Sequence, residues 1–346
     1  MVPLYKPYMP AELPELENIL HSGALAYGKW GKDFESKLRA YVGVDYLMTT
    51  NTYSMAIQIA LNVLGLKPGD EVIASPMSCL ASNQPLNTYG LKVKWADVDP
   101  ETGTLSPDSV ENSITPDTKL IFHNHFCGYI GYVDEICAIG REFGIPVIDD
   151  CVEAFGSKYK GHIAGNLGSD ITIFSFQTIR LPNTIDGGAL TFKDKSLYEA
   201  ALLARDYGIR RNIFRDGYGE ISPACDISTP GFGGTMSEIN SYIGCRQMED
   251  MPMLLAKQRE NASHWDSEIG QYKLNSRKEI EPNYWVYGIL SDDKLNDMLM
   301  FRRKGYFASG VHLPNTYYSA FGRQIQMTGV QTFYNRFLAL PSGWWI

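Results

Sequence analysis

Short apolar runs alternate with helix-like segments over the first two-thirds of the chain. Six runs predict strands, at Glu71–Ala74, Val93–Ala96, Leu120–His123, Pro146–Asp149, Ile171–Phe176 and Ala189–Phe192. Between them, apolar residues recur at helical spacing in Ser54–Leu64, which Gly65 closes, and in Val133–Phe143, which Gly144 closes. Strands that alternate with helices predict a doubly wound α/β domain with a largely parallel sheet.

The pattern changes near Pro252. Met251–Ile269 predicts one long helix, and the segments after it predict a strand, a helix and a second strand, at Asn283–Leu290, Asp293–Lys304 and around Val311. The last seven residues predict no closing helix. We therefore expect a large α/β domain with an N-terminal arm over residues 1–250 and a smaller α+β domain over residues 251–346.

Composition narrows the class of protein. The 346 residues are 44% hydrophobic and 20% charged, which is enough apolar material for a core. The net charge is −8 with no long basic run, so a nucleic-acid partner is not expected. The first ten residues do not resemble a signal peptide, and no apolar run is long enough to span a membrane. The six cysteines form no CxxC pair, so we expect a reduced, cytoplasmic protein.

The strongest chemical candidate is the pair Asp149-Asp150, followed by Glu153. The carboxylates stand where a predicted strand ends, and ligands of open α/β sheets bind at that edge. A carboxylate there can hold a protonated ring nitrogen or a metal ion. It can also cap the next helix, which is the commoner role.

Three further segments carry polar groups to places where ligands bind. Hydroxyls in Thr50–Ser54 precede a helix, where they either cap it or bind a phosphate with the backbone amides. Ser175–Arg180 and then Asp186–Gly188 follow a strand, as an ordinary hairpin also would. Pro230–Met236 reads as a flexible loop. None of these segments is specific alone.

Their order and spacing resemble those of the DegT/StrS family of nucleotide-sugar aminotransferases. The resemblance covers nearly the whole chain. It rests on these segments together with Gly28–Gly31, Phe34-Glu35, Glu71–Ile73, Ser75–Asn83, Ala96–Pro100, His125, Gly128, Tyr207–Arg211 and Tyr284-Trp285. It implies the fold type I architecture, a homodimer with shared active sites, no metal, and a vitamin B6 cofactor, either pyridoxal 5'-phosphate or pyridoxamine 5'-phosphate. It also implies glutamate as amino donor and a nucleotide-linked keto-deoxysugar of surface polysaccharide (lipopolysaccharide, O-antigen) biosynthesis as substrate.

The resemblance also implies roles for single residues. Asp150 pairs with the ring nitrogen, and Glu153 lies near the ring hydroxyl. Residues that bind the cofactor phosphate or ring are implied at Ser54, Met55, Cys79, Ser175 and Gln177. Residues that bind the sugar nucleotide are implied at Lys29, Arg210, Arg211, His312 and Asn315. The arginines also read as a solvated charge pair, and His312 and Asn315 as a loop at a strand end.

Arg180 stands where the family has its cofactor-binding lysine, five residues after Ser175. A desolvated lysine can lose its proton and form a covalent imine link, whereas arginine stays protonated in essentially any protein site. Any cofactor would therefore be held without a covalent bond. Arginine is also a poor base, and positioned base catalysis supplies roughly 10²–10⁴ in rate.

Other positions depart as well. Tyr53 stands in place of a glycine, Cys79 in place of an aromatic residue, and Gly233 in place of an asparagine that reaches the partner. Departures at several positions favour natural divergence over a single engineered change.

Three functions remain open at this point. The first is a glutamate-dependent aminotransferase. The second is a pyridoxamine-phosphate-dependent sugar dehydratase, which would need another base, with His125 as a candidate that also reads as a buried structural histidine. The third is a catalytically silent homologue that binds a nucleotide sugar or an active subunit.

Overall fold

The computed structural model describes residues 1–275, 277–322 and 326–346. Its helices are α1 (Leu16–His21), α2 (Lys29–Val42), α3 (Tyr53–Val63), α4 (Leu80–Thr88), α5 (Pro107–Ser113), α6 (Val133–Phe143), α7 (Lys195–Arg205), α8 (Glu238–Ile269), α9 (Lys294–Arg303) and α10 (Thr328–Arg336). Its strands are β1 (Leu47–Thr50), β2 (Glu71–Ala74), β3 (Lys92–Trp95), β4 (Thr118–Asn124), β5 (Val147–Asp150), β6 (Lys158–Tyr159), β7 (His162–Ile163), β8 (Ile171–Ser175), β9 (Gly188–Phe192), β10 (Ile280–Glu281), β11 (Tyr287–Leu290) and β12 (Phe337–Leu340). No helix among the described residues is both long and apolar enough to cross a membrane.

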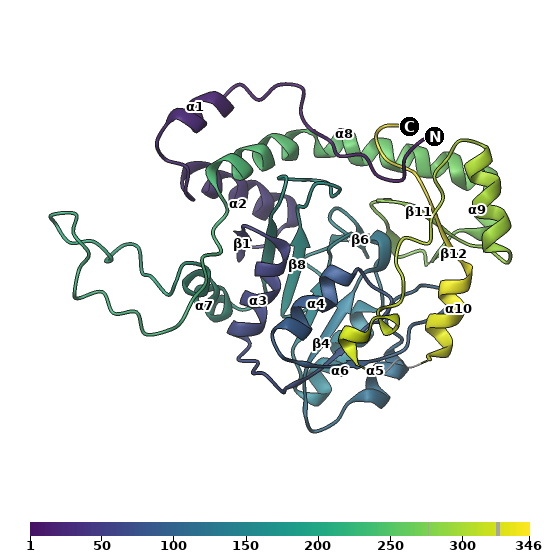
Figure 1. Ribbon diagram of the computed structural model, residues 1–346, viewed down its shortest axis with the longest axis horizontal. Coiled ribbons are helices and arrows are strands. Elements are labelled where there is room, and N and C mark those ends of the chain that lie inside the picture. Colours follow the sequence, from purple (N-terminus) through teal and green to yellow (C-terminus); the bar gives the residue numbers. More distant parts are fainter. Residues whose placement is uncertain (276, 323–325) are drawn as a thin grey trace.

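A seven-stranded sheet in the order β1-β9-β8-β5-β4-β2-β3 forms the centre of the molecule (Figure 1). Within this sheet, the neighbouring strands β3, β2, β4, β5 and β8 pair in parallel. Strand β9 pairs antiparallel with both β8 and β1. The largely parallel sheet is therefore confirmed. The six predicted strands form within one or two residues of their predicted bounds, and β1 was not predicted.

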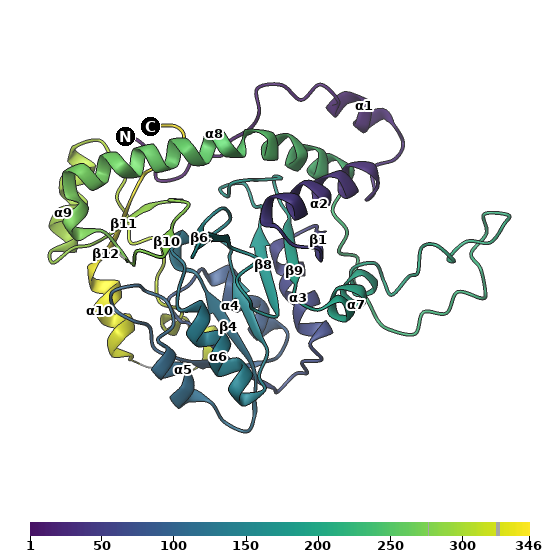
Figure 2. The same ribbon diagram turned by 180° about the vertical axis from the view of Figure 1, so that it is seen from behind.

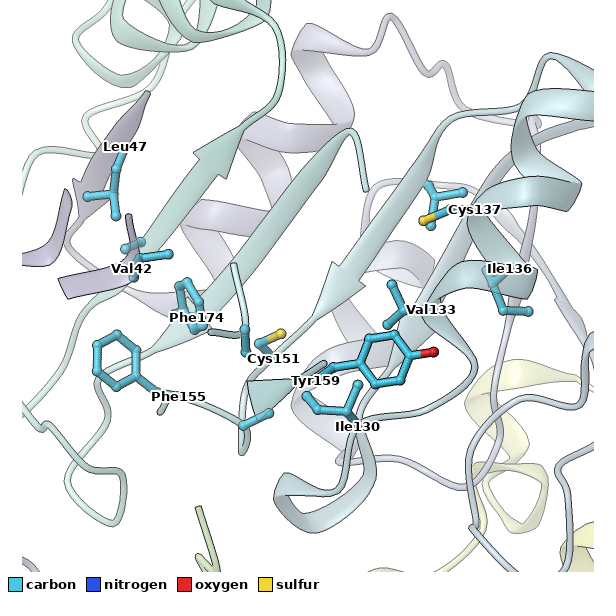
Figure 3. Packing of buried hydrophobic residues seen from close by; sticks show 14 of the residues in the cluster. Val42, Leu47, Ile130, Val133, Ile136, Cys137, Cys151, Phe155, Tyr159 and Phe174 are labelled. Carbon is cyan, nitrogen blue, oxygen red and sulfur yellow. The ribbon is translucent and has the colours of Figure 1, made fainter. Parts of the chain in front are cut away.

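Helices cover both faces of this sheet, as a doubly wound fold requires. On one face, apolar residues of α2, α5, α6 and α8 pack against the sheet, and on the other α3, α4 and α7 do so. Figure 3 shows the first layer, where Val133, Ile136 and Cys137 of α6 approach the side of the sheet that carries Phe174. Neighbouring residues of a strand divide between the layers, because side chains alternate along a strand: Ile73 belongs to the first and Val72 to the second.

One carboxylate holds the backbone of Gly28–Gly31 at the start of α2. Glu238, the first residue of α8, accepts hydrogen bonds from the amides of Gly28 (2.8 Å), Trp30 (3.1 Å) and Gly31 (3.0 Å). An anion at a helix N-terminus satisfies amides that have no partner within the helix. A Cβ on Gly31 would lie 2.4 Å from the Tyr27 ring, so the close approach requires glycine.

The C-terminal part differs from its prediction in three places. The strand predicted at Asn283–Leu290 forms only over Tyr287–Leu290, because Tyr284 has φ +54°. The long helix begins at Glu238, because Ser237 caps it and its first turns pack against α2, and it continues past Pro252 to Ile269. The predicted strand near Val311 is absent from the described residues. Val311 has φ +60°, which an extended strand excludes, and β12 pairs with β11 instead. The proposed division at residue 250 falls within α8 and stays a prediction.

An arm of residues 207–235 projects from the body beside α7 (Figures 1 and 2). It carries exposed apolar side chains, with Tyr218 94% and Ile221 62% exposed. Single exposed apolar residues are ordinary, but several together on a projecting segment are typical of an interaction surface.

Candidate active site

The paired carboxylates lie buried at the carboxyl end of β5, as predicted. Asp150 Oδ1 accepts a hydrogen bond from the Tyr53 hydroxyl at 2.6 Å and one from the Val152 amide at 3.1 Å. Asp150 Oδ2 is buried and has no hydrogen-bond partner among the described residues. Burial raises the pKa of this carboxyl, whereas the neighbouring hydroxyls of Ser82 and Tyr53 lower it.

Glu153 provides a second buried carboxylate, which three groups contact. Its Oε1 lies 2.9 Å from His312 Nε2 and 3.3 Å from the Arg180 guanidinium, and its Oε2 accepts the Cys127 amide at 2.8 Å. Burial raises the pKa of Glu153, but His312, Arg180 and the Cys127 amide outweigh burial and hold that pKa below its usual value. Glu153 therefore stays ionised, and its negative charge pairs with the positive charge of the Arg180 guanidinium.

Arg180 is buried, with only 8% of its surface exposed. Its guanidinium carbon lies 4.4 Å from the centre of the Trp285 ring, and this ring also stacks on Tyr5, with ring centres 4.5 Å apart. The Trp285 indole N–H donates to the Ile179 carbonyl at 3.1 Å, which fixes the ring. A cation on an aromatic face and beside a carboxylate is held firmly, so Arg180 is a fixed part of the site.

The cavity beside Arg180, among the described residues, is small. A cavity lined by Val152, Glu153, Ser175, Arg180 and Trp285, among others, has a volume of about 10 Å³. That volume holds about one water molecule. The carboxylates suit the vitamin B6 cofactor that the family resemblance implies, because the unpartnered Asp150 Oδ2 can accept a ring N–H. Arg180 does not suit the covalent link that the family lysine forms with this cofactor.

The residues implied for the cofactor phosphate lie around the same sheet edge. Ser54 is exposed in the first turn of α3, and the Met55 amide donates to the capping Thr52 side chain at 3.0 Å. Ser175 is buried at the end of β8, and Gln177 is exposed two residues later. Cys79 lies directly before α4, where burial raises the pKa of its thiol. These roles stay predictions.

His125 belongs to a separate buried cluster. Its Nδ1 accepts the Gly131 amide at 3.1 Å, and its Nε2 lies 3.7 Å from Asp149 Oδ1, which is 3.0 Å from His123 Nδ1. Asp149 leaves β5 on the opposite face from Asp150. The two histidines and Asp149 have the composition of a metal site. However, a neutral imidazole has one lone pair, and His125 already uses it for Gly131. The cluster is therefore better described as a hydrogen-bonded network.

The residues implied for the sugar nucleotide divide into two groups. His312 and Asn315 lie at the site. His312 contacts Glu153, and the buried Asn315 side chain donates to the Ser78 carbonyl at 2.9 Å. Lys29, Arg210 and Arg211 are exposed. The two arginines lie on the projecting arm, where Arg211 forms a two-pronged ion pair with Asp206.

Two departures from the family pattern now have a structural explanation. A Cβ on Gly233 would lie 2.2 Å from the Tyr207 hydroxyl, so the tyrosine takes the space of a larger side chain. Tyr53 reaches Asp150 across 97 positions of sequence. Sequence reasoning did not predict this contact, nor the role of Trp285. The only available signal was the presence of a large aromatic residue where the family has glycine.

Comparisons with known proteins agree with this architecture. The model of the DegT/DnrJ/EryC1/StrS aminotransferase family matches residues 9–344. GDP-perosamine synthase of Escherichia coli O157:H7 is 29% identical over 294 residues, which are 84% of this chain and 78% of that protein.

Two solved structures are similar over the whole chain. The structure of AtS13 from Actinomadura melliaura matches with a TM-score of 0.92 and 31% identity, over 100% of this chain and 95% of that one. The sugar aminotransferase CalS13 from Micromonospora echinospora matches with a TM-score of 0.92 and 26% identity, over 100% and 96%. The fold is therefore that of fold type I sugar aminotransferases, and the chain belongs to the DegT/DnrJ/EryC1/StrS aminotransferase family.

Proposed function

We propose that this chain binds a nucleotide-linked keto-deoxysugar in the cytoplasm, as part of the synthesis of a surface polysaccharide such as lipopolysaccharide O-antigen. Family membership supports a nucleotide-sugar ligand. The similar synthase is named for GDP-perosamine, which is itself a nucleotide-linked sugar. The ligand would lie at the carboxyl end of the sheet, beside His312, with its phosphates reached by Arg210 and Arg211 of a second copy.

One observation decides what the chain does with this ligand. Arg180 is buried, ion-paired with Glu153 and stacked on Trp285. A guanidinium cannot act as the nucleophile or as the base that transamination needs at this position. The geometry therefore best supports a catalytically silent homologue, which binds the sugar nucleotide without aminating it.

The second candidate is a slow aminotransferase that holds pyridoxamine or pyridoxal phosphate without a covalent bond and takes its amino group from glutamate. When bound, the cofactor ring acts as an electron sink. The buried Asp150 Oδ2, without a partner among the described residues, favours this candidate because a protonated ring nitrogen would satisfy it. The dehydratase alternative has less support, since its candidate base His125 is engaged with Gly131 and Asp149.

Nucleotide-sugar binding without turnover is the expected result for the wild-type chain. Calorimetry with a panel of GDP-, UDP- and dTDP-linked 4-keto-6-deoxysugars should identify a ligand, and incubation with glutamate should release no 2-oxoglutarate. Arg210→Ala/Arg211→Ala should weaken binding by about tenfold or more, because charged hydrogen bonds contribute roughly 1.5–3 kcal/mol each. Lys195→Ala, in an exposed ion pair on α7, is the matched control. Rapid 2-oxoglutarate release would overturn the silent assignment, and no binding across the panel would overturn the ligand class.

We also propose a homodimer that the projecting arm helps to form. Ile213→Asp/Ile221→Asp places charges on exposed apolar positions of the arm and should shift the protein from dimer to monomer, as measured by light scattering during size-exclusion chromatography. Leu295→Asp, at a 62% exposed position of α9, should leave the dimer intact. A wild-type monomer at micromolar concentration would contradict this assignment.

A further inference from the structure

Tyr53 places a phenol ring against Asp150, the carboxylate that meets the cofactor ring nitrogen in the family pattern. The residue begins α3 and is 5% exposed. Its hydroxyl lies 2.6 Å from Asp150 Oδ1 and 3.0 Å from Ser82 Oγ. Since the hydroxyl has one proton, the shorter contact to the carboxylate takes it, and Ser82 supports the phenol oxygen from the other side.

The phenol offers the carboxylate a hydrogen-bond donor on an aromatic ring, as a protonated pyridine ring does, although the phenol carries no positive charge. Each is a six-membered aromatic ring that presents one polar hydrogen to Asp150. A glycine at position 53 would leave this space open, whereas tyrosine fills it with a ring of similar size. Tyr53 belongs to the same buried apolar cluster as Val152 and Ala56.

The phenol of Tyr53 keeps its proton. Burial, and then the Asp150 carboxylate, raise the pKa of the Tyr53 hydroxyl well above its usual value. The phenol therefore keeps its proton and remains a hydrogen-bond donor at physiological pH. It supports Asp150 without help from any bound molecule.

Protein atoms enclose the carboxylate. Asp150 is fully buried, and Ser175 at the end of the neighbouring strand is 4% exposed. The phenol occupies Oδ1 of Asp150, and Oδ2 is buried without a hydrogen-bond partner among the described residues.

We propose that Tyr53 is a built-in substitute for the cofactor ring, which binds Asp150 in its place and keeps pyridoxal and pyridoxamine phosphate out of the pocket. The inference rests on the proposed silent function and gives it a second cause, independent of Arg180. Arg180 prevents the covalent link, whereas Tyr53 prevents the non-covalent binding that would otherwise remain. Each block is removed by a different substitution.

The test measures cofactor binding to the full chain by calorimetry and by absorbance, with pyridoxal phosphate and pyridoxamine phosphate as probes. Wild type, Tyr53→Phe and Arg180→Lys should bind neither probe at micromolar concentration, because the ring at position 53 remains. Tyr53→Gly should bind both at least tenfold more tightly than wild type. Tyr53→Gly/Arg180→Lys should turn yellow and retain the cofactor after borohydride reduction.

Two outcomes would overturn the inference. One is wild-type protein that binds either probe as tightly as Tyr53→Gly. The other is Tyr53→Phe binding less than wild type, because Tyr53 would then orient Asp150 for the cofactor instead of replacing it. If the glycine variant fails to fold, binding of either probe to wild type at micromolar concentration overturns the inference on its own, as does weaker binding by Tyr53→Phe than by wild type. Nucleotide-sugar binding by wild type is measured in parallel, and its absence would refute the proposed ligand class while leaving the cofactor result intact.

Discussion

The double variant Tyr53→Gly/Arg180→Lys, supplied with pyridoxal phosphate, is expected to aminate a 4-keto sugar nucleotide from glutamate. A desolvated lysine provides both the nucleophile and the base that arginine cannot provide. Positioned base catalysis alone supplies roughly 10²–10⁴ in rate, so the gain over wild type should be at least of this size. Release of 2-oxoglutarate and the mass of the amino sugar nucleotide measure the reaction.

The single variants separate the two causes. Arg180→Lys should stay near the wild-type rate while Tyr53 holds Asp150. Full activity in Arg180→Lys would show that Tyr53 does not exclude the cofactor. A double variant that binds the cofactor covalently and remains inactive would show that the sugar site, and not the cofactor site, has lost its function.

Glu153→Ala is expected to lower the free energy of unfolding by roughly 3–5 kcal/mol, because it leaves the Arg180 guanidinium buried without its carboxylate. Urea denaturation followed by circular dichroism measures the change. Combining it with Arg180→Met should recover much of the loss, since the uncompensated charge is removed. Glu249→Ala breaks exposed ion pairs with Lys37 and Arg246 and should cost no more than about 1 kcal/mol. A similar small loss for Glu153→Ala would refute the assigned role of the buried pair.

The lowered pKa of Glu153 predicts that its contribution to the free energy of unfolding depends on pH. The pKa of folded Glu153 lies below its ordinary value of 4.5, so its contribution is present above that value and is lost as the pH falls through the lower folded-state pKa. The stability difference between wild type and Glu153→Ala should therefore shrink on acidification from ~pH 7 to ~pH 3. A difference that stays constant over this range would contradict the lowered pKa.

Much of the central fold could be predicted from sequence, because local patterns determine it. The helix Val133–Phe143 forms with the predicted bounds, and Gly144 ends it with φ +66°. The edge strand Leu47–Thr50 was not predicted, since its four residues include two threonines and show no apolar run. The start of α8 was also missed, because Glu238–Asp250 mixes buried Ser241 and Gly244 with apolar residues, and only packing on α2 fixes it as helix.

The candidate site was predicted in part. Asp150, Glu153, Ser175 and Arg180 were identified because their spacing follows a family pattern, and the structure brings them to one sheet edge. What these residues contact could not be predicted. The Trp285 ring beneath Arg180 comes from a segment over 100 residues further along the chain, and such contacts depend on the tertiary fold.

The length of α8 has a mechanical consequence. Its 32 residues rise about 48 Å at 1.5 Å per residue, and the helix runs without interruption from the arm to the C-terminal part (Figure 2). Hinges normally lie in loops or at element ends, so position 250, in the middle of this helix, is a poor pivot. We therefore expect the arm's attachment and the C-terminal part to move together, as one rigid unit, and not to open about residue 250.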